Sequence, residues 1–266
     1  MDYNTLIAGM KRFGSAEQVI FDTYGYGAAA EYINENVILA PWWEPDILPG
    51  LGEARLRSVS GDGKLWTIKG DDLEMTYIKT GVGAPRVLDR LLALGLTRCK
   101  RAVFIGSVGA LDAGIGIGDI VVPEYSVCGD GASRYLSPDM ARDVFGEKAY
   151  PDAAMLEKAK AETARLCQKH SVRWHVGRTF SIDTIFAQFA HIGEIVGMGC
   201  NSIEMETAAA FRAAGLMGLP LAALFSVSDN TVTSKSLVSV RTPEEMEYRH
   251  FVRRELFPEI ILPLFR

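Results

Sequence analysis

Strand-like apolar runs alternate with helical segments along this sequence, and that alternation limits the fold more than any other feature. Several runs are almost wholly apolar and rich in β-branched residues, which is typical of strands buried on both faces of a sheet. Because parallel strands need crossover connections, strands that alternate with helices predict a mainly parallel sheet with helices on both faces. The predicted class is α/β. The expected strands are 36–40, 64–68, 75–80, 102–105, 119–127, 172–180, 202–205 and 221–227.

Start signals mark the helices expected between these strands. Asp152 is a candidate N-cap for a helix over 152–170. Thr242-Pro243-Glu244-Glu245 has the residues of a capping box, with proline at the first helical position. Further helices are expected over 85–94 and 207–215.

The domain organisation follows from the absence of any linker-like, repetitive or low-complexity segment in the sequence. Residues 36–266 are therefore expected to form one αβα domain. Residues 1–35 have no clear period and are expected to form a helical or irregular extension packed on that domain.

Charge and composition exclude several classes of partner. The chain has 28 Lys and Arg against 33 Asp and Glu, and no basic run, which argues against nucleic acid and anionic membranes. Its longest apolar stretches, such as 219–227, are shorter than the roughly 20 residues of a membrane span, and its first residues lack the order of a signal peptide. Neither the cysteines nor the histidines have metal-ligand spacing. We therefore expect a cytoplasmic protein with no metal or organic cofactor.

Three glycine motifs lie at or after predicted strands: Gly81-Val82-Gly83, Gly106-Ser107-Val108-Gly109 and the glycines of 114–118. They fail the dinucleotide-binding fingerprint, because strand-like residues and not a helix follow Gly118. A nicotinamide-dependent oxidoreductase would rest on these glycines alone. They are either turns or a ligand cradle at the carboxyl ends of the strands, where open α/β sheets bind ligands.

Acidic residues follow two of the predicted strands. In Glu204-Met205-Glu206, ordinary helix-dipole chemistry explains one glutamate but not both. Asp229 closes the most apolar run of the chain. It is either a turn residue or a desolvated carboxyl whose raised pKa would suit a general acid.

Taken together, these motifs resemble the nucleoside phosphorylase and nucleosidase superfamily. The resemblance covers about residues 36–256 and also includes Gly118-Asp119-Ile120-Val121 and Phe180-Ser181-Ile182-Asp183. It implies a three-layer αβα sandwich with a mixed, mainly parallel central sheet. It also implies a homo-oligomer, as a dimer or a trimer of dimers, that cleaves the N-glycosidic bond of a nucleoside.

The resemblance also implies roles for single residues. Asp229 matches the general acid that protonates N7 of a purine, and Glu206 the carboxylate that binds the ribose 2′ and 3′ hydroxyls. Met205 matches the apolar wall beneath the sugar. The remaining substrate-binding residues expected from the match are Phe180, which would stack on the base, and Glu204, Ser107, Val108, Gly109 and Gly83.

The base class follows from a departure from one branch of the family. Uridine phosphorylases resemble one another in a Gln-x-Arg that reads the pyrimidine edge, whereas Gln188-Phe189-Ala190 lacks the arginine. Because Asp229 is present as well, a purine nucleoside is favoured.

The sequence leaves open whether the nucleophile is water or phosphate. The family's phosphate-binding arginines are absent from 41–46 and from Phe104-Ile105-Gly106-Ser107, which favours water over phosphate as co-substrate. Glu44 is either the carboxylate that activates water or a surface residue. Arg57 or Arg86 would restore phosphate binding if either reached the site.

The sequence also leaves open which arginine supports the acid and whether the protein is catalytic. Either Arg241 or Arg249 supports the acid, and Arg241 is nearer the expected spacing. A protein that binds a nucleoside without cleaving it is the alternative from another class.

Overall fold

Ten strands form one sheet in the computed structural model, which describes residues 1–14, 30–47, 55–60, 64–70 and 73–266. Each of the eight expected strands is present, and β2 and β7 are additional. The strands are β1 (Asn36–Ala40), β2 (Arg55–Ser58), β3 (Leu65–Lys69), β4 (Glu74–Lys79), β5 (Arg101–Ala110), β6 (Ile120–Gly129), β7 (Lys148–Ala149), β8 (Trp174–Ile182), β9 (Ser202–Glu204) and β10 (Leu221–Asn230).

The helices include all four expected ones and also α5, which was not expected from the sequence. Asp152 accepts a hydrogen bond from Met155 N at the start of α4, and Thr242 and Glu245 form the expected capping box. The α-helices are α1 (Tyr3–Phe13), α3 (Ala84–Leu94), α4 (Ala153–His170), α5 (Ile185–Gly197), α6 (Thr207–Met217), α7 (Pro243–Phe251) and α8 (Phe257–Leu264), with a π-helical turn η6 (Val252–Leu256) between the last two. The 3₁₀ helices are η2 (Ala30–Tyr32), η3 (Pro45–Ile47), η4 (Ala132–Leu136) and η5 (Thr231–Thr233).

The sheet is mixed, as predicted, and part of it closes on itself. Strand β5 pairs with β10, β10 with β6, β6 with β8, β8 with β9, and β9 again with β5. The two longest pairings, β5 with β10 and β6 with β8, are parallel. Strands β1, β4, β3 and β2 extend the sheet outward from β5. The result is a five-stranded ring with a four-stranded wing, and the short β7 pairs with β6 beside the ring.

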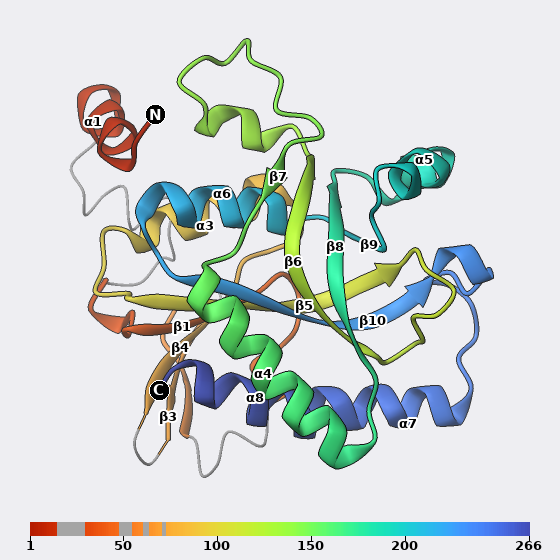
Figure 1. Ribbon diagram of the computed structural model, residues 1–266. Helices are drawn as coiled ribbons and strands as arrows, with labels where there is room; N and C mark the ends of the chain where they lie inside the picture. Colours follow the sequence, from red (N-terminus) through yellow and green to blue (C-terminus); the bar gives the residue numbers. More distant parts are fainter. Residues whose placement is uncertain (15–29, 48–54, 61–63, 71–72) are drawn as a thin grey trace.

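Helices cover both faces of this sheet (Figure 1), as the sequence predicted. Alternate residues of β1 point to opposite sides: Val37 and Leu39 join the core under α3 and α6, and Ile38 and Ala40 join the core under α4 and α8. Burial on both faces explains why these strands read as continuous apolar runs.

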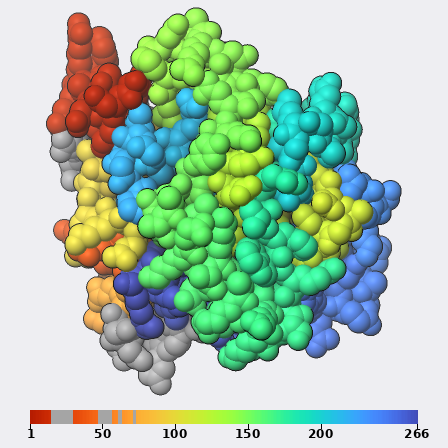
Figure 2. Space-filling model, in the orientation of Figure 1, coloured from red at the N-terminus to blue at the C-terminus, as the bar shows by residue number. Residues whose placement is uncertain are grey.

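Several elements project beyond the sheet at one end of the molecule. Figure 2 shows α1 (red), the segment 130–147 (light green) and α5 (teal) at the top of the view. Tyr3 of α1 donates a 2.6 Å hydrogen bond to the carbonyl of Leu92 on α3. Part of the expected extension 1–35 therefore packs on α3, and its residues 15–29 lie outside the described ranges. Within those ranges, every helix is too short or too polar to cross a lipid bilayer.

One glycine motif is not a turn. Residues 106–109 lie inside β5, in register with residues 225–229 of β10. Pairing with β10 overrides the preference of glycine for turns, so β5 runs through to Ala110. The motif therefore lies on the strand that borders the site described below.

Candidate active site

A cavity of about 520 Å³ is lined by residues near the ends of β5 and β10 and by residues of α5 and α7. This volume lies in the range of sites for small molecules. The lining comes from widely separated parts of the chain: Pro41, Trp42, Val82, Ser107, Gly109, Ile185, Gln188, Ile203, Glu204, Met205, Glu206, Ser228, Asp229, Leu237, Arg241 and Arg249. The cavity brings together most of the residues that the sequence singled out.

Strand register places the acid. Gly109 of β5 pairs with Asp229 on one side and with Ile203 on the other. A Cβ at Gly109 would lie 3.0 Å from Asp229 Oδ2 and 3.2 Å from Ile203 Cγ2, so a glycine lets the strands approach this closely. The register shifts between Val227 and Asp229, and such a bulge changes the direction of side chains beside it.

Asp229 is a buried carboxyl with one hydroxyl partner. It is 5% exposed, and Ser228 Oγ donates a hydrogen bond of 2.5 Å to its Oδ1. Burial raises the pKa of Asp229, and the Ser228 hydrogen bond and the charges of Arg241 and Arg249 oppose that rise. A carboxyl with a raised pKa retains its proton closer to neutral pH, as a general acid must.

Arg241 holds the backbone beside the acid. Its guanidinium donates to the carbonyls of Ser228 at 3.0 Å, Ser236 at 2.6 Å and Ser239 at 2.9 Å. Arg241 therefore ties the segment after β10 to the residue that precedes Asp229.

Glu204 is the glutamate that serves the helix. Its Oε2 accepts hydrogen bonds from the backbone N–H of Glu206 at 2.7 Å and of Thr207 at 2.8 Å, at the start of α6. Its other oxygen accepts from Ser181 Oγ. Burial raises the pKa of Glu204, whereas these hydrogen bonds lower it. Although Glu204 borders the cavity, its acceptors are already occupied by helix capping.

Glu206 is the other member of the pair, and it is also buried. Its Oε1 accepts a 2.6 Å hydrogen bond from the backbone N–H of Gly83, which has φ +98° at the start of α3. Burial and then the charge of Glu204 raise the pKa of Glu206 to about 8. Both glutamates were expected at the substrate; in the structure both line the cavity, and Glu204 also caps the start of α6.

Ser107 offers an unused polar group. Its Oγ is buried, lines the cavity and has no hydrogen-bond partner among the described residues. Three residues earlier on β5, Phe104 stands where the resemblance implies an arginine, and its ring is buried against Phe225. Arg57 and Arg86 are both exposed, and neither lines the cavity.

Several expected residues lie elsewhere. Phe180 is 2% exposed and packs against Phe145, outside the cavity lining, because the end of β8 faces its own apolar cluster. Val108 points into the core, since it alternates with Ser107 and Gly109 along β5. Glu44 forms an ion pair with Lys79 and does not line the cavity. Gly83 lines a neighbouring cavity and reaches this site through its bond to Glu206.

The structure also adds residues that the sequence did not assign to the site. Trp42, Leu237 and the α5 residues Ile185 and Gln188 line the cavity. The motif that contains Gln188 was informative only through its missing arginine. Helix α5 was missed because its sequence is apolar around much of its circumference and lacks the polar face that marks a helix.

The similarity to known proteins agrees with this geometry. Residues 46–250, more than half of the chain, match the family described as the phosphorylase superfamily. Uridine phosphorylase of Thermococcus kodakarensis is 24% identical over 210 residues, which are 72% of either protein. Guanosine phosphorylase of Halorubrum lacusprofundi is 27% identical over 164 residues, 61% of this chain and 64% of that protein.

A solved structure extends the likeness of the fold to almost the whole chain. The AMP nucleosidase from Bacteroides thetaiotaomicron aligns with a TM-score of 0.66 and 14% identity, over 93% of this chain and 98% of that one. The resemblance drawn from the short motifs is confirmed.

Proposed function

The chain belongs to the phosphorylase superfamily, and on that premise we propose that it hydrolyses the N-glycosidic bond of purine nucleosides. Asp229 protonates N7 as the base leaves, because its burial favours the protonated carboxyl. Glu206 accepts hydrogen bonds from the ribose hydroxyls, and Met205 forms the apolar wall of the sugar site. Together these groups stabilise an oxocarbenium-like sugar and a neutral leaving base.

The distribution of positive charge around the cavity carries this proposal. Among the described residues, the cationic side chains of the lining are Arg241 and Arg249, and the charges of both act on Asp229 at the base end. The segments outside the described ranges contain no Lys or Arg. A phosphate dianion beside Ser107 would have hydroxyl and backbone donors alone to replace its hydration. Binding a neutral water molecule does not require the desolvation of a charge.

Water therefore takes the place of phosphate in the proposed reaction. The Ser107 hydroxyl, which has no other partner among the described residues, orients this water for attack on C1′. The C1′–N9 bond breaks, and the oxygen of the water forms the new bond to C1′. The proton that the water loses replaces the one that Asp229 gave to the base. Glu44 has no part in this scheme, since its carboxylate pairs with Lys79 outside the cavity.

Phosphorolysis is the second candidate, and the names of the relatives favour it. Curated relatives of this chain are uridine and guanosine phosphorylases. If phosphate binds here, a guanidinium from another subunit is the simplest source of the missing charge.

Release of base from a panel of nucleosides tests the proposal. Inosine, guanosine, adenosine and uridine are incubated with the enzyme in phosphate-free buffer and in phosphate, and the sugar product is identified. We expect free ribose from a purine nucleoside at a rate that added phosphate leaves unchanged. Formation of ribose 1-phosphate would contradict hydrolysis and show that the enzyme is a phosphorylase. Binding without release of any base would favour the non-catalytic alternative.

We also propose that 36–266 is one domain of a cytoplasmic homo-oligomer. Exposed apolar side chains on α5 and on the segment 130–147 support self-association: Ile185, Phe186, Phe189, Tyr135, Met140 and Phe145. Trp42 is half-exposed, whereas Trp43, its neighbour, is buried against Phe257 and belongs to the core. Light scattering during size-exclusion chromatography tests the association, and a monomeric mass would contradict it.

A further inference from the structure

Two arginines line the base end of the cavity, and only one of them is engaged. Arg241 donates to three backbone carbonyls beside the acid. The guanidinium of Arg249 donates no hydrogen bond to a described residue, and its Nε is buried without an acceptor. A guanidinium with unused donors can form hydrogen bonds to an acceptor on a bound ligand.

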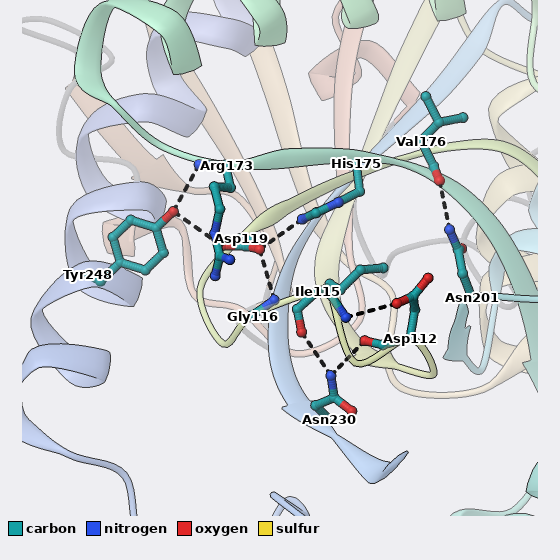
Figure 3. A network of polar contacts seen from close by, with 11 residues as sticks. Asp112, Ile115, Gly116, Asp119, Arg173, His175, Val176, Asn201, Asn230 and Tyr248 are labelled. Atoms are coloured by element: carbon teal, nitrogen blue, oxygen red, sulfur yellow. Dashed lines mark hydrogen bonds and ion pairs between the residues drawn. The ribbon is translucent and has the colours of Figure 1, made fainter. Parts of the chain in front are cut away.

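The position of Arg249 is set by the residue beside it on α7. Tyr248 donates a 3.3 Å hydrogen bond to Asp119 Oδ1 and accepts one of 3.1 Å from the backbone N–H of Arg173 (Figure 3). Asp119 is fully buried and also binds His175 Nε2 and the backbone N–H of Gly116, each at 2.8 Å. The glycine-rich segment before Asp119 therefore serves as the anchor of α7.

Gly118 completes this anchor through close packing. It has φ +87°, and a Cβ there would lie 2.5 Å from Tyr248 Cδ1 and 3.1 Å from Arg249 Cγ. The backbone at Gly118 thus lies directly against the part of α7 that carries Arg249. The anchor holds the guanidinium at the end of the cavity where its charge acts on Asp229.

The chemistry of these two side chains specifies one edge of a base. A protonated carboxyl and a guanidinium both donate, so they match two adjacent acceptors. Guanine and hypoxanthine present such a pair, N7 and O6, whereas adenine presents the N7 acceptor beside an N6 amino donor. A guanidinium cannot accept a hydrogen bond from that amino group.

We infer that Arg249 binds the exocyclic oxygen of a 6-oxopurine while Asp229 protonates N7, so that the enzyme selects inosine or guanosine over adenosine. This inference rests on the proposed function. It makes Arg249 the residue that determines base specificity, and it leaves to Arg241 the positioning of the backbone beside the acid.

The test compares kcat/KM for inosine and adenosine in the wild type and in Arg249→Met. The wild type should prefer inosine, and the variant should lose about 10- to 100-fold of the inosine rate while its adenosine rate changes little, as expected for one charge-assisted hydrogen bond. Arg254→Met is the matched control, because Arg254 is a half-buried arginine just beyond α7 that does not line the cavity. The ratio of kcat/KM for inosine to kcat/KM for adenosine in Arg254→Met should equal that of the wild type.

Other outcomes separate the inference from the function. A wild type that cleaves adenosine at least as well as inosine, or an Arg249→Met variant that loses both rates equally, overturns the inference and leaves the nucleosidase proposal standing. A wild type that cleaves no nucleoside overturns the proposed function. Calorimetric measurement of the affinity for hypoxanthine and for adenine gives a readout independent of turnover. Arg249→Met should weaken the binding of hypoxanthine and leave the binding of adenine unchanged. A raised KM for phosphate in the variant would instead assign Arg249 to phosphate and overturn the inference.

Discussion

Replacement of Glu206 by glutamine should cost activity and increase stability at alkaline pH. The buried carboxyl has a pKa of about 8 in the folded chain because of burial and the charge of Glu204, against the usual value of 4.5. Since the folded state binds this proton more tightly than the unfolded state, stability falls as pH rises from about 4.5 through 8. Glutamine carries no such proton, and its carbonyl can still accept from Gly83 N–H.

The size of the effect follows from the same pKa values. Each pH unit between the two values corresponds to about 1.4 kcal/mol, so ionisation of Glu206 destabilises the fold by several kcal/mol, on the order of 5 above pH 8. The wild type should therefore lose clearly more unfolding free energy than Glu206→Gln between pH 5 and pH 9, and the two should be similar near pH 5.

Urea unfolding at these pH values measures the difference directly. Parallel stability profiles, or a variant that is less stable than the wild type at pH 9, would contradict a raised pKa at Glu206. At pH 9, where Glu206 is ionised, the variant should show kcat/KM lowered by about 100-fold, because a neutral amide accepts weaker hydrogen bonds from the ribose hydroxyls than a carboxylate does. A variant with wild-type activity would remove Glu206 from the sugar site.

Three further substitutions separate chemistry from architecture. Asp229→Asn should lower kcat by about 100- to 10,000-fold with ligand binding retained, since the amide fills the same space but cannot protonate the base; an unchanged rate in stopped-flow assays would exclude Asp229 as the acid. Glu204→Ala should cost about 2–4 kcal/mol at pH 6 in urea unfolding, because the donors at the start of α6 lose their acceptor, and a neutral effect would contradict the capping role. Gly118→Ala should destabilise the fold more than Gly146→Ala, because both glycines have positive φ but only Gly118 has Tyr248 in the space of the new Cβ; equal melting temperatures would show that α7 does not depend on this contact.

Much of the fold was predictable because the strands of the sheet are buried on both faces. Residues 36–40 and 221–227 read as strands from apolar content alone, and the structure confirms both. The capping box at Thr242 was equally local, since four consecutive residues contain all of its contacts. Strand β5 was predicted too short because its glycines resemble a turn, and only the distant β10 shows that they pair.

The site was predictable as a set of residues but not in its geometry. Sequence reasoning assigned both Glu204 and Glu206 to substrate binding, and which of them caps α6 depends on which carboxylate reaches the helix N–H groups. Likewise, the register shift beside Ser228 depends on the pairing of β10 with β5 and leaves no local signal. The resemblance predicted that Phe180 stacks on the base, whereas in the structure its side chain packs into the apolar cluster at the end of β8.

The closed ring of strands has a consequence for how the chain reaches its native state. Strand β10 lies between β5 and β6, and its partner residues on β5 are about 120 positions earlier in the sequence. The ring cannot close during synthesis until residues 221–230 have left the ribosome. Until then β5 and β6 each present an unpaired edge, and such edges promote aggregation. The high contact order of this pairing predicts slow folding, and the acid on β10 means that the catalytic pocket is completed in that same late step.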